Sequence, residues 1–290
     1  MTDWVLGVIG GSGLYEIDGL EDKSWIDVAG PWGAPSDQLL TGRIGGVKLV
    51  FLPRHGRGHR IPPSGLNARA NIDALKRAGC TDILSISAVG SLREELDPGT
   101  FVVVDQYVDR TVGRVSSFFG EGCVAHVSVA DPVCARLAGL AAEAGRAAGA
   151  RLTEGGTYLA MEGPQFSTRA ESALYRQWGC DVIGMTGMPE AKLAREAELP
   201  YASVCMVTDY DCWREESADV EVDHIVAVMH ANAAVAKGLV KALAGLLAAR
   251  PRTPSPIDTC LDMAIITPPE HRDPALLAKL DAVAGRALRR

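Results

Sequence analysis

"NARANIDALKRAGCTDILSIS", residues 67–87, joins a helix to a buried strand and decides the fold class. In its first part, Ile72 and Leu75 are apolar, the last turn is basic, and Gly79 provides a helix stop. In its second part, residues 83–87 form a short apolar run typical of a strand. A helix that leads directly into an apolar strand is the repeating unit of α/β folds. The segment therefore predicts an α/β domain.

The same alternation extends in both directions along the chain. Thr168 and Glu171 have the spacing of a capping box, which predicts a helix from there to about residue 177. Other helices are expected at 131–149, 189–198 and 220–248, and other strands at 5–9, 47–52, 101–105, 157–161, 181–183 and 201–207. This order predicts a mixed central β-sheet flanked by helices.

A proline-rich stretch near the C-terminus divides the chain into two parts. Residues 1–250 are expected to form a single domain, and residues 251–290 a proline-rich linker followed by one amphipathic helix, "DPALLAKLDAVAGRALR". That helix is expected to pack on the body of the domain or on a neighbouring subunit.

Composition limits the function classes. The 290 residues are 47% hydrophobic and 22% charged, and the net charge of −7 argues against nucleic-acid and anionic-membrane partners. The seven cysteines show no metal-ligand spacing, so reduced thiols, a cytoplasmic location and no metal are expected. There is no uninterrupted run of about 18 apolar residues, and the N-terminus does not read as a signal peptide. Any anion site must be a local pocket.

Three short motifs could hold a phosphate. The glycine-rich turn "GGSG" (10–13) after the first strand offers backbone N–H groups and the Ser12 hydroxyl, although it matches neither a P-loop nor a dinucleotide fingerprint. "RHGRGH" (54–59) offers the Arg54 guanidinium beside His55. Ser87 ends a buried-looking strand. Each motif also has a purely structural interpretation. The glycine-rich turn could be a tight exit from the strand, RHGRGH a basic surface loop, and Ser87 a small residue required for close packing.

His55 also has a catalytic interpretation. Arg-His-Gly after a strand is how histidine phosphatases begin, with the histidine as the covalent nucleophile. Here, however, the motif follows some 50 residues of other structure, and none of the remaining histidines stands in an obvious catalytic loop.

Two further motifs suit a nucleoside. "EGPQF" (162–166) places Phe166 for stacking on a ring, with Glu162 or a backbone group meeting sugar hydroxyls. "VTDYDCW" (207–213) has Asp209 and Asp211 at i and i+2, which in an extended strand lie on one side. Such carboxylates could bind a metal, act as an acid pair, start a turn, or accept the exocyclic N–H of a purine.

Taken together, eight motifs in order resemble the trimeric purine nucleoside phosphorylase family, in particular its members that act on 5′-methylthioadenosine. They cover roughly residues 4–245 and read IGGSGL, RHGRGH, N-x-x-A-N-I-x-A-L-K, GSLREE, DQ-x-x-DRT, EGPQFSTRAE, MTGMPE and VTDYDCW. Each motif is weak alone, and the ordered set is specific.

The resemblance implies roles for individual residues. The implied phosphate ligands are Ser12, Arg54, His55, Ser87, Ala88 (through its N–H) and Thr186. The implied nucleoside neighbours are Phe166, Met185, Val222, Ile225 and a His126 lent by an adjacent subunit of a homotrimer. Asp209 and Asp211 fall at the purine-reading, catalytic positions.

The resemblance also implies the reaction, which is phosphorolysis of 5′-methylthioadenosine to adenine and 5-methylthioribose 1-phosphate. Inorganic phosphate is then a co-substrate, and no cofactor is needed. Two carboxylates favour adenine over hypoxanthine, because a 6-oxo group would meet them lone pair to lone pair. The alternatives are a phosphorylase for methylthioinosine or 6-oxopurine nucleosides, a histidine phosphatase using His55, a dinucleotide dehydrogenase, and a nucleoside-binding module without turnover.

Overall fold

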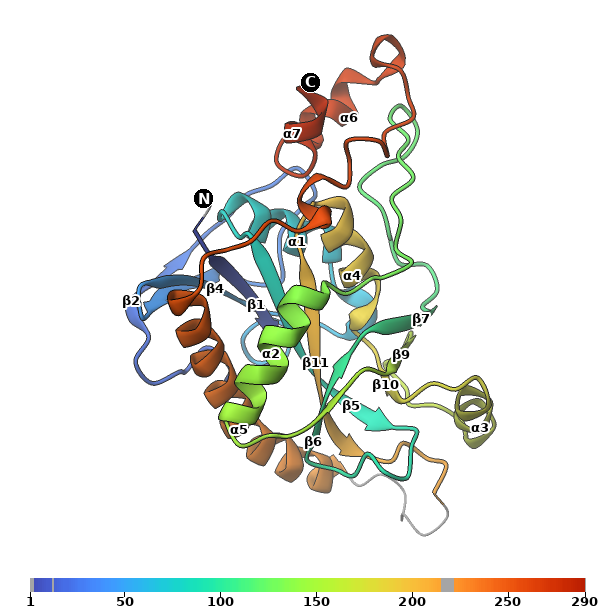
Figure 1. Cartoon of the computed structure of the whole chain (residues 1–290). Coiled ribbons are helices and arrows are strands. Elements are labelled where there is room, and N and C mark those ends of the chain that lie inside the picture. The colour runs from blue at the N-terminus through green and yellow to red at the C-terminus, as the bar shows by residue number, and fades with distance from the viewer. Residues whose placement is uncertain (1–2, 12, 215–221, 290) are drawn as a thin grey trace.

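The fold is known from a computed structural model that describes residues 3–11, 13–214 and 222–289 (Figure 1). Within these residues, eleven strands form one mixed sheet in which β5 pairs with β1, β10 and β11. The strands are β1 (Val5–Gly10), β2 (Glu21–Ile26), β3 (Leu39–Ile44), β4 (Val47–Pro53), β5 (Asp82–Ser91), β6 (Thr100–Val104), β7 (Gln106–Arg110), β8 (Arg151–Glu154), β9 (Thr157–Met161), β10 (Val182–Gly184) and β11 (Tyr201–Asp209). The predicted mixed sheet is confirmed.

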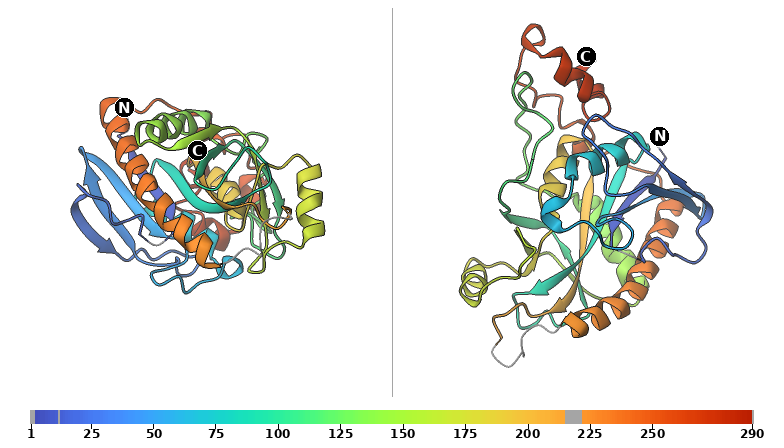
Figure 2. Two further views of the ribbon diagram at one scale, coloured as in Figure 1. Left: turned by 90° about the horizontal axis from the view of Figure 1, so that it is seen from below. Right: turned by 180° about the vertical axis from the view of Figure 1, so that it is seen from behind.

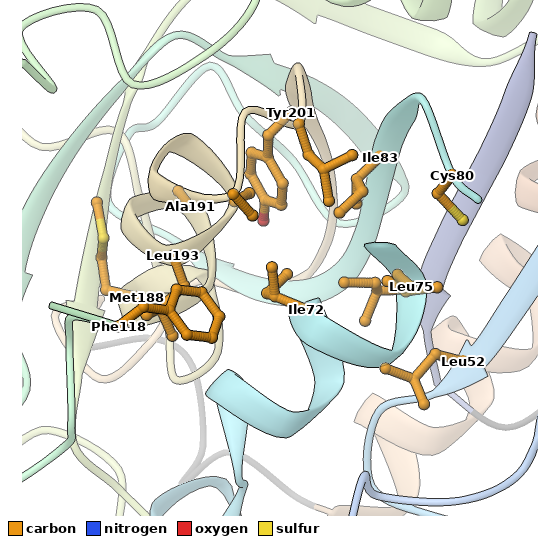
Figure 3. Close-up of a cluster of buried hydrophobic side chains, with 14 of the residues drawn as sticks. Leu52, Ile72, Leu75, Cys80, Ile83, Phe118, Met188, Ala191, Leu193 and Tyr201 are labelled. Carbon is orange, nitrogen blue, oxygen red and sulfur yellow. The ribbon is translucent and has the colours of Figure 1, made fainter. Parts of the chain in front are cut away.

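Helices cover both faces of this sheet (Figure 2). They are α1 (Ala68–Arg77), α2 (Ala135–Ala147), α3 (Arg169–Gln177), α4 (Gly187–Glu196), α5 (Val222–Ala249), α6 (Pro274–Lys279) and α7 (Gly285–Leu288). α1 and α4 bury Ile72 and Leu193 on one face, and α2 and α5 bury Leu137 and Leu239 on the other. Figure 3 shows α1 and α4 meeting over the strand that carries Tyr201.

Local signals in the sequence explain where two helices begin. The side chain of Asn67 accepts a hydrogen bond from the Ala70 N–H at the start of α1. Thr168 and Glu171 form a complete capping box at the start of α3, which confirms the predicted helix.

Four strands were not predicted, because each lacks an apolar run or follows another strand closely. β2 reads EDKSWI and β8 reads RLTE, and both are largely exposed. The apolar-run criterion detects strands that are buried on both faces, and these strands lie at or near the margins of the sheet.

The C-terminal segment differs from the single amphipathic helix that was predicted. Two short helices, α6 and α7, flank a turn that buries Leu280, Val283 and Ala284, and Asp281 within the turn pairs with Arg77 of α1. Leu261, Leu280 and Val283 belong to the same core cluster as Ile72. The segment therefore packs on the body of its own chain, beside the end of α1 (Figure 1).

α5 is the longest helix. Its residues Val228–Ala249 are long and apolar enough to cross a membrane by length and composition alone. In the fold this helix buries Leu239, Leu243 and Leu247 in the core cluster that it shares with α2. These contacts account for its apolar character.

Candidate functional site

The candidate site lies where the carboxyl ends of several strands meet. β1 pairs in parallel with β4 and β5, and β5 pairs in parallel with β11, so these four strands end at one edge of the sheet. The register places Cys205 opposite Ser87, and both Asp209 and Ile183 opposite Gly90. Carboxyl ends of neighbouring parallel strands are the usual ligand site of open α/β sheets. Segments far apart in the sequence thus converge here.

Arg54 lies beneath this edge and is 2% exposed. Its Nε and Nη2 donate to the two carboxylate oxygens of Glu190 at 3.1 and 3.2 Å. Nη1 donates to the Ile86 carbonyl at 2.9 Å and Nη2 to the Ser85 hydroxyl at 2.6 Å. The guanidinium is therefore bound by protein groups, its charge is paired with Glu190, and its contacts to Ser85 and Ile86 place it beside the segment of β5 that leads to Ser87.

His55 follows Arg54 at the end of β4 and is half-buried. Its Nδ1 lies 2.9 Å from the Ile61 carbonyl, which can only accept, so Nδ1 carries the proton. Burial, reinforced by the charge of Arg54, lowers the pKa of His55 to about 4. The imidazole is therefore neutral at pH 7, with Nε2 as an acceptor.

Ser87, Ala88 and Thr186 are the other predicted phosphate ligands that the structure describes. The Ser87 hydroxyl is buried and has no hydrogen-bond partner among the described residues, apart from the weakly accepting thiol of Cys205. Ala88 is the next residue of β5 and is half-buried. Thr186 caps α4, and its N–H donates to the Tyr158 hydroxyl at 3.3 Å. The Ser87 hydroxyl can therefore donate a hydrogen bond to a bound group.

Asp209 and Asp211 lie at the end of β11. The Thr208 hydroxyl donates to one oxygen of Asp209 at 2.7 Å, and the Asp211 N–H donates to the other at 2.8 Å. The expectation that an extended strand presents both on one side is wrong, because β11 ends at Asp209 and Asp211 has a left-handed backbone with φ 52°. A turn, rather than strand periodicity, brings the two carboxyl groups together.

Asp211 is 5% exposed, and one of its carboxyl oxygens has no hydrogen-bond partner among the described residues. Burial, aided by the charge of Asp209, raises its pKa to about 6. Near neutral pH the carboxyl group is mostly ionised, and a small fall in pH protonates it.

The raised pKa makes folding stability depend on pH in a definite direction. A carboxyl group whose pKa is higher in the folded state stabilises the protein at low pH, and that contribution is lost as the pH rises through about 6. Relative to wild type, Asp211→Asn should therefore gain on the order of 2–3 kcal/mol in unfolding free energy between pH 4 and pH 7. Urea unfolding at both pH values tests this, and a pH-independent difference would contradict it.

The predicted nucleoside neighbours Phe166 and Met185 lie in the turns after β9 and β10. Phe166 is 58% exposed, so its ring is open to a ligand or a partner. Met185 lies against Gly163, where a Cβ atom would come within 2.4 Å of the Met185 sulfur. Gly163, with φ 66°, thus lets the two turns approach each other.

Arg114 was not identified from the sequence. It lies in the loop after β7, and its Nε donates to the Glu162 carboxylate, which also accepts from the Val112 N–H. Glu162 is thus engaged by the protein through its carboxylate. An arginine in an irregular loop gives no pattern from which its partners 47 to 74 residues away could be inferred.

Four predicted residues are not placed beside these groups. Ser12 lies outside the described residues, and Val222 and Ile225 are in the first turn of α5, where the structure describes no side chains. His126 is exposed, and its backbone N–H donates to the Ala264 carbonyl. Its loop runs beside the C-terminal segment, at the opposite end of the molecule from the carboxyl ends of β5 and β11 (Figure 1).

The chemistry of this edge suits an anion next to a polar heterocycle. Ser87 lies on β5 beside Ile86, whose carbonyl binds Arg54, and His55 follows Arg54 at the end of the neighbouring part of the sheet. The carboxyl group of Asp209 lies farther along, opposite Gly90 of β5. In the part of the chain that the structure describes, no three His, Cys, Asp or Glu side chains are grouped to hold a metal ion.

Comparison with known proteins gives consistent results. Residues 5–244 match the model of the Phosphorylase superfamily. S-methyl-5'-thioadenosine phosphorylase of Cereibacter sphaeroides is 61% identical over 98% of this chain and 99% of its own, and that of Bradyrhizobium diazoefficiens is 58% identical over both full lengths.

Solved structures of methylthioadenosine phosphorylases are also similar to this chain. A methylthioadenosine phosphorylase from an Antarctic soil metagenomic library superposes with a TM-score of 0.91 at 44% identity, over 98% of this chain and 99% of that one. The Schistosoma mansoni methylthioadenosine phosphorylase in complex with tubercidin gives 0.79 at 37% identity, over 86% and 93%.

Proposed function

The chain belongs to the phosphorylase superfamily, and we propose that it catalyses the phosphorolysis of 5′-methylthioadenosine. The relatives that carry this activity in their names match it at 58–61% identity over almost the whole chain. The single structural observation that carries the proposal is the buried hydroxyl of Ser87, which has only the Cys205 thiol as a partner among the described residues and follows Ile86, whose carbonyl binds Arg54. This hydroxyl can donate to an anion at the strand edge where the purine-facing carboxyl groups also lie.

In this reaction the phosphate is the nucleophile. One of its oxygens forms a bond to C1′ of the sugar, the bond from C1′ to N9 breaks, and the electron pair leaves with the purine. Ser12, Ser87, Thr186 and the Ala88 N–H are proposed to donate to the phosphate, and His55, whose Nε2 is an acceptor, is proposed to accept from a protonated phosphate oxygen. Arg54, whose charge is paired with Glu190, is proposed to support these ligands through its hydrogen bonds to Ile86 and Ser85 of β5.

The two carboxyl groups act on the leaving group. The purine departs with negative charge on its five-membered ring, and Asp209 is proposed to hold or deliver a proton at N7. Asp211, ionised above about pH 6, is proposed to accept the exocyclic N–H of adenine. Phe166 and Met185 would contact the base and the ribose, and Val222 and Ile225 the methylthio group. No side chain becomes covalently attached, so His55 has no nucleophilic role in this mechanism.

We also propose a cytoplasmic homotrimer in which His126 of one subunit completes the site of the next. Exposed apolar side chains support an interface on the long loop after β7 and on the C-terminal segment. They are Val112, Val115, Val124, Val129, Met263 and Ile266. All seven cysteines are free thiols, in keeping with a reducing compartment. Sedimentation equilibrium tests the trimer, which a monomer mass would contradict.

One assay tests the proposed reaction. The purified protein is incubated with methylthioadenosine, methylthioinosine, adenosine or inosine, each with and without phosphate, and release of free base is followed. We expect adenine from methylthioadenosine only when phosphate is present. Base release without phosphate would identify a hydrolase, and binding without release in either condition would identify a nucleoside-binding module. Faster cleavage of methylthioinosine would overturn the adenine preference.

A further inference from the structure

Arg114 joins the two turns that carry the nucleoside side of the site. Its side chain is 9% exposed. Nη1 donates to the Met185 carbonyl at 2.7 Å and to the Met188 carbonyl at 2.9 Å, on the turn between β10 and α4. Nη2 donates to the Glu162 carbonyl at 2.6 Å and lies 3.4 Å from the Met161 carbonyl, on the turn after β9. Nε donates to the Glu162 carboxylate at 3.1 Å.

These contacts use the whole guanidinium. An arginine has five N–H donors in a rigid planar fork, and here every donor has an acceptor on one of two separate turns. Lysine, with a single flexible ammonium group, cannot hold two turns at a fixed separation in this way. Arg114 therefore fixes the distance between the two turns and also neutralises the Glu162 carboxylate.

The acceptors lie where the backbone departs from regular structure. Met188 has a non-helical backbone, φ −119° and ψ 141°, inside the span of α4, so its carbonyl lies outside the regular helix. Gly163 follows Glu162 in a left-handed conformation. Arg114 thus satisfies main-chain groups that neither a helix nor the sheet accounts for.

Most of the phosphate side does not depend on Arg114. Thr186 lies on the turn that Arg114 binds, between Met185 and Met188, but the N–H groups of Thr186 and Gly187 also donate to the hydroxyl of Tyr158, a buried residue of β9, at 3.3 and 3.4 Å. Ser87 belongs to β5, and His55 follows β4. Loss of Arg114 would therefore loosen the turns of Met185 and Phe166 more than the phosphate ligands.

We propose that Arg114 is a positioning residue that sets the separation of the two nucleoside-contacting turns, and so controls nucleoside binding in preference to phosphate binding. The inference rests on the proposed function. Arg114 acts through Met185 and the segment leading to Phe166, and it need not touch the substrate.

The test compares Arg114→Met, which removes all five donors at similar length, with Glu162→Gln, which removes only the charge of its partner. KM for methylthioadenosine and for phosphate are measured at saturation of the other substrate. Arg114→Met should raise the nucleoside KM by about 10- to 100-fold, because small misplacement of a bound group has effects of this size, and should leave the phosphate KM within about 3-fold. Glu162→Gln should change both little, because the four carbonyl contacts persist.

Equal changes in both KM values, or equal effects of the two variants, would overturn the proposal, because a purely structural ion pair predicts them. If Arg114→Met does not fold, Arg114→Lys keeps the charge and should show the same split between the KM values. If wild type shows no phosphorolysis, the proposed function fails on its own. Calorimetric titration with methylthioadenosine then decides the positioning role, which unchanged affinity in Arg114→Lys would refute.

Discussion

Replacing Asp209 by asparagine is expected to lower kcat/KM for methylthioadenosine by about 10²- to 10⁴-fold, the usual contribution of general-acid help to a leaving group. Asparagine keeps the shape, and its single carbonyl oxygen can still accept from the Asp211 N–H. Its NH2 group takes the place of the other oxygen and can donate to the Thr208 hydroxyl, which keeps the Val89 carbonyl as its acceptor. It cannot supply the proton or the negative charge that the departing purine requires. The measurement is steady-state kinetics with saturating phosphate.

The same variant should change which base is preferred. The amide N–H of asparagine can donate to a 6-oxo group, so the ratio of kcat/KM for methylthioinosine to that for methylthioadenosine should rise roughly 5- to 150-fold. Glu143→Gln serves as a control and should leave the ratio unchanged. Glu143 lies on α2, and the replacement also removes one negative charge, here from an exposed ion pair with Arg250. An unchanged ratio in Asp209→Asn would exclude base reading by this carboxylate.

Replacing Glu190 by alanine is expected to lower the free energy of unfolding by about 3–5 kcal/mol, because it leaves the buried charge of Arg54 without its partner. The Ser85 and Tyr201 hydroxyls, each 2.8 Å from the same carboxylate oxygen, lose an acceptor as well. Urea unfolding measures the loss. Phosphate binding should weaken too, because an unpaired guanidinium no longer holds one position beside the segment of β5 that leads to Ser87.

A double replacement separates the charge from the packing. Arg54→Met combined with Glu190→Leu removes both charges, and it should be less destabilised than Glu190→Ala alone. Glu143→Ala, at the exposed pair with Arg250, should change stability little. If Glu190→Ala lost no more stability than Glu143→Ala, the buried pair would not hold this edge of the sheet together.

Much of the fold could be predicted because its signals are local. The capping box at Thr168 and the apolar runs of β1, β4, β6 and β9 depend on neighbouring residues, and they fall where they were expected. Strands such as β2 were missed because their side chains face water, so that polar residues carry no penalty there.

The site was harder to predict because its contacts are not local. The motifs indicated that Arg54 and His55 lie near a phosphate, but nothing near Arg54 indicates that Glu190, 136 residues away, would take up its Nε and Nη2 donors. Asp211 was expected in extended structure, and only the left-handed turn shows how it reaches Asp209. The role of Arg114 depends on two turns that meet through tertiary packing, which no spacing in the sequence records.

The packing of the C-terminal segment has a consequence for the boundaries of the chain. The match to the superfamily ends at residue 244, yet Leu261, Leu280 and Val283 lie in the core cluster with Ile72 and Leu193. Arg286 reaches back to the Glu198 carboxylate, and Asp281 pairs with Arg77. A chain that ended at residue 244 would expose apolar surface of α1 and α4, which chaperones and proteases recognise. The part of this protein that the superfamily model matches is thus smaller than the part it needs in order to mature.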